Sequence, residues 1–171
     1  MMGEGAAPAS QGAGAGIRRA RVLAIDPGST CGFAVGCDAL VATSGTWDLT
    51  PRRGESPGVR YLRLRARLND VLAGYPDLKL VVYEQAHHRG GAATEYAAGV
   101  ATDIQSWCAE HGIEHATLHS ATVKKHATGK GNAKKPALIA AALARFGRRM
   151  PDDNEADALW LLDAWLVREG V

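Results

Sequence analysis

The strongest constraint on the fold is a continuous apolar run over residues 78–83, which only Lys79 interrupts. A strand of this composition is covered on both faces, as the central strands of α/β sheets are. An alanine-rich segment over Ala92–His111 predicts a helix, Gly112 ends it, and a further strand is expected over Glu114–Leu118. A strand, a helix and a second strand in this order predict parallel pairing within one sheet.

Three short strands are expected before this unit, over residues 21–25, 31–35 and 40–47, with Asp-Pro-Gly and Gly-Cys-Asp turns between them. This pattern is typical of an antiparallel meander. A helix should follow, with Ser56 as its cap and Pro57 in its first turn. Further helices are expected to start at Ser120, at about Ala133 and after Pro151. The elements together predict an α/β fold, in which helices cover both faces of a mixed five-stranded sheet.

Length and composition favour one domain. Residues 20–171 hold all the expected elements, whereas residues 1–19 are a Gly- and Ala-rich tail that we expect to be disordered. No apolar run approaches the length of a membrane span, and no signal-peptide pattern opens the chain, so we expect a cytoplasmic protein. The three cysteines include no Cys-x-x-Cys pair, which favours reduced thiols over a zinc site.

The positive charge of the chain is clustered although the net charge is only +2. An arginine-rich stretch covers residues 52–67, a lysine-rich segment covers residues 124–135, and a third group comprises Arg145, Arg148 and Arg149. Local basic patches on a nearly neutral protein suit a polyanionic partner. Ordinary solvated faces are the alternative interpretation of such charge runs.

Acidic residues lie at the ends of separate apolar segments. Asp26 closes the first strand, Glu84 closes the apolar strand, and Asp157 lies in the last helix. If the first and fourth strands are neighbours, their carboxyl ends bring Asp26 and Glu84 together at the usual position of a site in an open α/β sheet. Carboxylates of this kind suit Mg²⁺, with Mn²⁺ as a substitute. Two ions could activate a water and stabilise the leaving oxygen of an in-line displacement.

A further ligand is expected near Asp157. Asp153 and Asn154 precede it by four and three residues, which puts both on the same helix face. Asp153 is therefore a candidate catalytic and metal-binding residue, and Asn154 a candidate metal ligand. Asp152 or Asp153 could instead serve only as the helix cap.

The lysine-rich segment is a candidate phosphate-binding site. It offers two loop glycines, the amides of a helix start and the ammonium groups of Lys124, Lys125, Lys130, Lys134 and Lys135. Its spacing of Gly and Lys differs from that of a Walker A loop, which argues against a nucleotide triphosphatase.

From about Arg21 onward the sequence resembles the RuvC family of Holliday-junction resolvases, within the ribonuclease H-like superfamily. The resemblance is carried by Ile25-Asp26-Pro27-Gly28, by Glu84-Gln85, by the segment from Val123 to Lys135 and by Ala156-Asp157-Ala158-Leu159. It implies a Mg²⁺-dependent homodimer that nicks two strands of a four-way junction symmetrically, leaves 5′-phosphates and acts in DNA recombination and repair. It also implies that Lys124 and Lys135 hold DNA phosphates near the scissile bond.

Two positions depart from the family pattern. Asn154 stands where the family usually has Asp or His, and His87 stands where it often has an aromatic residue that stacks on bases. His87, His88 and Arg89 are the expected DNA contacts of this loop, since imidazole can also stack. The departures keep two alternatives open: a broader branched-DNA nuclease of flaps and forks, of chromosomal or phage origin, and a junction-binding protein with little catalysis. A third alternative is an enzyme on the same superfamily core that cuts RNA in hybrids.

A homodimer also follows from symmetry, because a substrate with two equivalent strands to cut calls for two active sites related by a two-fold axis. The helix from Ala92 to Trp107 is the expected interface, since Ala97, Ala98, Gly99 and Ala101 permit close approach. The alternative is that this helix is buried within one subunit. The sequence carries no indication of a helicase partner.

Overall fold

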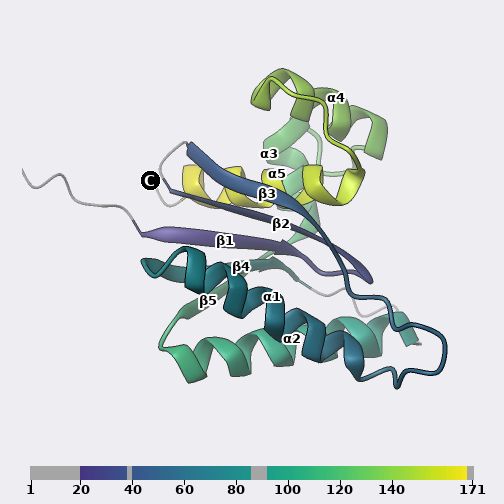
Figure 1. Cartoon of the computed structure of the whole chain (residues 1–171). Helices are drawn as coiled ribbons and strands as arrows, with labels where there is room; N and C mark the ends of the chain where they lie inside the picture. The colour runs from purple at the N-terminus through teal and green to yellow at the C-terminus, as the bar shows by residue number, and fades with distance from the viewer. Residues whose placement is uncertain (1–19, 38–39, 86–91, 169–171) are drawn as a thin grey trace, which may run out of the picture.

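A computed structural model describes residues 20–37, 40–85 and 92–168 of the chain (Figure 1). The predicted tail over residues 1–19 lies outside the described residues. No helix within the described part is long and apolar enough to cross a membrane.

A single mixed sheet forms the centre of the fold, with the strand order β3-β2-β1-β4-β5. β1 pairs antiparallel with β2, which pairs antiparallel with β3, while β1, β4 and β5 run parallel. The strand bounds are β1 Arg21–Asp26, β2 Thr30–Cys37, β3 Leu40–Asp48, β4 Leu78–Glu84 and β5 Glu114–Leu118. The predicted five-stranded mixed sheet is therefore confirmed.

Helices cover both faces of the sheet, as predicted. α1 (Val59–Gly74) and α2 (Ala92–His111) lie on one face, and α3 (Ser120–Thr128), α4 (Lys135–Phe146) and α5 (Asp153–Arg168) lie on the other (Figure 1). α5 packs directly on β1 and β2, and α3 and α4 pack on α5. Among the described residues the apolar side chains accordingly form two cores, one on each side of the sheet.

The alternation of side chains along β1 explains the two cores. Leu23 and Ile25 face α1 and α2, whereas Val22 and Ala24 face α5. Successive residues of a strand point to opposite faces, so a strand that is apolar at every position requires a helix layer on each side.

The predicted cap of α1 was wrong. α1 begins at Val59 with Gly58 as its N-cap, and Ser56 instead closes the preceding turn, where its hydroxyl accepts a hydrogen bond from the N–H of Gly58. α4 begins at Lys135, two residues after the approximate start predicted at Ala133. Pro136 takes the first turn of α4, where its missing N–H costs nothing.

A glycine on β2 determines how closely α5 approaches the sheet. A methyl group at Gly32 would lie 1.9 Å from the carbonyl oxygen of Asn154, which is far inside van der Waals contact. Gly32 is also the register partner of Asp26. The absence of a side chain at this one position therefore brings the first turn of α5 against the sheet beside Asp26.

The Gly32→Ala substitution should displace the start of α5 and destabilise the protein by about 1–3 kcal/mol or more, as overpacking does in closely packed cores. Thermal or urea unfolding measures this change. Gly74→Ala is the matched control, because a methyl group at Gly74 would meet nothing within 4 Å. Equal stability of the two variants would contradict the close approach of α5.

Candidate metal centre

Three acidic side chains line one cleft at the carboxyl edge of the sheet. β1 and β4 are neighbours with Ile25 opposite Tyr83, so Asp26 and Glu84 follow at the ends of adjacent strands. Asp157 reaches the same cleft from α5. The cleft has a volume of about 470 Å³, and its other lining residues are Ser120, Val123, Lys124, Ala133, Lys134, Lys135 and Leu138. The structure therefore brings together the three acids that the sequence singled out.

The surroundings of the cleft disfavour the ionised forms of Asp26 and Asp157. Burial, followed by the charges of Asp157 and Glu84, raises the pKa of Asp26 to about 7. Burial, followed by the charge of Glu84, raises the pKa of Asp157 to about 6. Carboxylates that repel each other in a poorly solvated cleft are stabilised by a cation among them.

The donor set fits a hard divalent cation. Within the described residues, no three His, Cys, Asp or Glu side chains converge closely enough to hold an ion in the side-chain arrangement of this structure. The fit therefore rests on chemistry and charge: three carboxylates in one cleft offer oxygen ligands of the kind that Mg²⁺ and Mn²⁺ prefer.

Two roles were predicted for the acids at the start of α5: helix cap and metal ligand. Asp152 is the helix cap, because its carboxylate accepts the N–H of Glu155 at 2.9 Å and the hydroxyl of Thr46 at 2.9 Å. The Asp153 carboxylate is paired with the ammonium of Lys135, which lowers its pKa. Neither Asp153 nor Asn154 lines the cleft in this arrangement, and both remain predicted ligands.

A buried acid that the sequence analysis missed supports the start of α5. Glu155 is only 3% exposed, and its carboxylate accepts hydrogen bonds from Arg148 and, at 2.7 Å, from the hydroxyl of Ser44 on β3. These contacts tie the α5 start to the edge strand and to the turn before α5. Its only sequence signal was an acid beside the alanine of Ala-Asp-Ala-Leu, which also fits a solvated helix turn.

The predicted phosphate-binding lysines divide into two groups. Lys124, Lys134 and Lys135 line the cleft with the acids, whereas Lys125 and Lys130 are exposed and do not line it. The Lys124 charge opposes the rise in the pKa of Asp157, and that of Lys135 does so for both Asp157 and Asp26. The remaining predicted DNA contacts, His87, His88 and Arg89, lie outside the described residues.

Some of the small residues of α2 pack against other elements of the same subunit. A methyl group at Gly99 would lie 2.2 Å from the hydroxyl oxygen of Tyr61, so this glycine admits α1. Ala97 and Ala101 line a smaller cavity of about 140 Å³ next to Asp26 and Glu84. Ala98 is exposed. The predicted alternative of burial within one subunit therefore holds at Gly99.

The sequence matches no protein-family profile and no curated protein. The solved structures that are similar to the chain include two of RuvC. RuvC from T. thermophilus in complex with a Holliday junction substrate is 21% identical, with a TM-score of 0.73. A second structure of Thermus thermophilus RuvC is 23% identical, with a TM-score of 0.67. Each alignment covers 88% of this chain and 96% of the other.

The chain has the RuvC fold. The similarity spans nearly all of the RuvC chain, so the sheet and its helices correspond throughout. It confirms the predicted ribonuclease H-like architecture. In the RuvC fold of this chain, the carboxyl ends of β1 and β4 and the start of α5 form one acidic edge.

Removing the Asp26 charge should stabilise the protein in the absence of divalent ions. The fold raises the pKa of this carboxyl from 3.8 to about 7, so the folded state binds its proton more tightly and stability is lost as the pH rises through this interval. In EDTA at about pH 8, Asp26→Asn should unfold several degrees above wild type, since one pKa unit corresponds to about 1.4 kcal/mol. The difference should shrink toward about pH 4.

Circular dichroism melting curves at a series of pH values measure this effect. Asp70→Asn, which removes an exposed carboxylate on α1, is the control and should show no comparable gain. A loss of stability in Asp26→Asn near neutral pH would contradict the electrostatic description of the cleft.

Proposed function

We propose that the protein is a structure-selective endodeoxyribonuclease that resolves four-way DNA junctions by hydrolysing phosphodiester bonds. The observation that carries the proposal is the joining of three acids and three lysines in one cleft: Asp26, Glu84, Asp157, Lys124, Lys134 and Lys135. Acids for a cation and ammonium groups for phosphates are the two needs of phosphodiester hydrolysis. The RuvC fold supports the same choice, because one of the similar structures contains a Holliday junction substrate.

Asp26, Glu84 and Asp157 would hold Mg²⁺, which Mn²⁺ would replace in the assay, and we expect two ions per site. When bound, Mg²⁺ supplies the positive charge that polarises a phosphodiester and an attacking water. The protein keeps the acids at fixed places, because two of them end strands of one sheet and the third lies on a helix that packs on that sheet.

Lys124 and Lys135 would hold DNA phosphates at the wall of the cleft. Lys124 lies on α3 and Lys135 opens α4, so the two ammonium groups come from separate helices. Lys135 is also paired with Asp153. A phosphate that binds Lys135 would compete with this carboxylate, which would leave Asp153 available as the supporting ligand.

Symmetric nicking of a junction requires two active sites, so we propose that the protein acts as a homodimer. We also propose that each nick leaves a 5′-phosphate. A two-fold axis relates the two equivalent strands, and the enzyme matches it with two copies of the same site. The exposed side of α2 remains the proposed interface, with Ala98 on it, since Gly99 is engaged with α1.

A junction-binding protein with little catalysis is the second candidate. Its support is the start of α5, where Asp153 is paired with Lys135 and the neighbouring Asn154 carries no charge. A site with only three acids would bind the second cation less tightly. The lysines would still bind DNA in such a protein.

The deciding experiment incubates the protein with a labelled four-way junction, a flap, a linear duplex and an RNA–DNA hybrid, in Mg²⁺ and in EDTA. We expect the wild-type protein to make paired symmetric nicks in the junction in Mg²⁺ but not in EDTA. Asp26→Asn should make no nicks in either condition. Cleavage of flaps as fast as junctions would favour a broader branch nuclease, and preferred cleavage of the hybrid would favour a ribonuclease. Tight binding without cleavage would favour the junction-binding protein.

The adjacent lysines of α3 provide a test of the cleft wall. Lys124→Ala should slow junction cleavage by roughly tenfold or more, because a positive group near the reacting phosphate is lost. Lys125→Ala removes the same charge one residue away from an exposed position outside the cleft, and should leave the rate nearly unchanged. Single-turnover cleavage measures both. Equal rates of the two variants would contradict the assignment of Lys124.

A further inference from the structure

The arginine-rich stretch over residues 52–67 divides into two groups in the structure. Three of its arginines pair with acids of the same chain, at N–O distances of 2.7, 2.6 and 3.5 Å: Arg63 with Glu55, Arg65 with Asp103, and Arg67 with Asp70. The side chains of Arg52, Arg53 and Arg60 form no ion pair with any residue in the described part of the chain. The first group is paired within the fold. The second group has no direct ion pair there, although the charge of Arg52 lies near enough to Asp48 and Glu55 to help lower their pKa values.

The loop that bears Arg52 and Arg53 is held in a defined shape. Arg63 on α1 donates to the carbonyl oxygen of Thr50 and, at 2.7 and 2.9 Å, to the Glu55 carboxylate. The same carboxylate accepts the backbone N–H of Arg52 at 2.6 Å. The loop therefore presents two exposed arginine side chains from an ordered backbone, which lowers the entropy lost when they bind a partner.

Arg60 is connected to the turn that follows Asp26. Its guanidinium lies 4.5 Å from the centre of the Tyr96 ring, and the Tyr96 hydroxyl donates to the carbonyl oxygen of Gly28 at 2.8 Å. The Nε atom of Arg60 is buried and has no hydrogen-bond partner among the residues that the structure describes. Arg60 therefore stacks on the same ring that holds the turn after Asp26.

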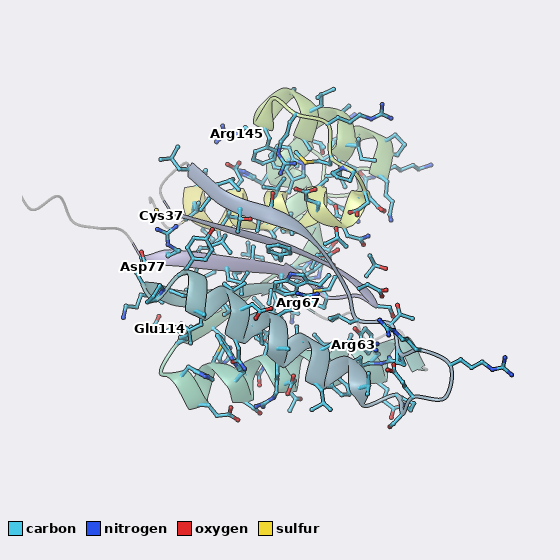
Figure 2. The ribbon with its side chains drawn as sticks, in the orientation of Figure 1. Cys37, Arg63, Arg67, Asp77, Glu114 and Arg145 are labelled. Carbon is cyan, nitrogen blue, oxygen red and sulfur yellow. The ribbon has the colours of Figure 1, made fainter. Side chains whose placement is uncertain are left out.

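These arginines lie at the same edge of the sheet as the acids, but on the opposite face from the lysines. The loop after β3 begins beside the turn between β1 and β2, where the N–H of Leu49 donates to the carbonyl oxygen of Ser29 at 2.8 Å. It then passes beyond the end of β1 to reach α1 (Figure 1). Figure 2 shows Arg63, which holds this loop, at the end of the molecule away from Cys37, Asp77 and Glu114.

We infer that Arg52, Arg53 and Arg60 form a second phosphate-binding surface, here called the arginine surface, which holds a double-stranded arm of the DNA. The inference rests on the proposed function, since it assumes a DNA substrate. Guanidinium groups suit phosphates because their planar donors can engage two oxygens at once.

The spacing of the two basic groups favours a duplex arm over the nucleotides at the cut. The lysines belong to the α3–α5 layer and the arginines to the α1–α2 side, with the sheet between them. A helix layer is about 10 Å thick, whereas one strand of B-DNA carries a phosphate about every 3.4 Å of axis. The arginine surface therefore contacts phosphates several nucleotides away from those at the lysines, and so orients the arm that enters the site.

The test is the double variant Arg52→Gln/Arg53→Gln, compared with Arg67→Gln/Lys79→Gln as a control of equal net charge. The control removes a paired arginine of α1 and an exposed lysine near the opposite end of β4. Binding of a linear duplex, a four-way junction and a single strand is measured in EDTA, between about 50 and 200 mM salt. Thermal unfolding confirms that both variants keep the wild-type fold.

We expect the double variant to bind the duplex roughly tenfold more weakly at the lower salt, with a slope of log affinity against log salt reduced by about 2. The control should keep the wild-type slope, and the single strand should lose less affinity than the duplex. Equal slopes for variant and control, or an equal loss for single strand and duplex, would overturn the arginine surface as described.

Cleavage in Mg²⁺ is measured in parallel and separates the two proposals. If the wild-type protein cuts junctions and the double variant keeps the wild-type salt slope, only the proposal of the arginine surface is wrong. If the wild-type protein binds DNA but cuts none of the substrates, the nuclease proposal is wrong. The salt slopes of variant and control then still test the arginine surface. A wild-type protein that binds no DNA overturns both.

Discussion

The approach of α5 to the sheet is the contact on which the candidate site depends. Gly32 leaves room for the carbonyl of Asn154, and this contact lies beside Asp26 in the register of β1 and β2. Asp157, one turn further along α5, consequently opens into the same cleft as the strand-end acids. A side chain at Gly32 would separate the acid of the helix from those of the sheet.

Polar contacts around the start of α5 maintain this approach against the repulsion of the acids. The cap by Asp152, its hydrogen bond to Thr46 and the buried contacts of Glu155 all join α5 to β3 or to the turn before the helix. Removing one partner of a buried charged group leaves the other unsatisfied, which is costly. Glu155 is therefore a structural residue, whereas Asp157 faces the cleft.

The two faces of the sheet contribute different groups to one edge. The α3–α5 side supplies lysines that line the acidic cleft, and the α1–α2 side supplies arginines and the tyrosine that holds the turn after Asp26. Both sets lie toward the edge where β1 and β4 end, on opposite sides of the sheet (Figure 1), because parallel neighbouring strands end at the same edge. An acidic centre with basic groups on both sides suits a polyanion that crosses the edge of the sheet.

The sequence by itself determined the elements and the acids. An apolar strand interrupted only by Lys79, a helix and another strand define a parallel unit. The pairing of the first and fourth strands brings the carboxylates at their ends together. The tertiary structure alone decided which polar groups are used for packing. Helical spacing puts Asp153 and Asn154 on the face of Asp157, yet the Lys135 pairing and the close contact at Gly32 depend on elements far away in sequence. Among the arginines of residues 52–67, Arg65 is held by Asp103 of α2, a contact that local periodicity does not encode, whereas Arg63 and Arg67 pair with acids nearby in the sequence.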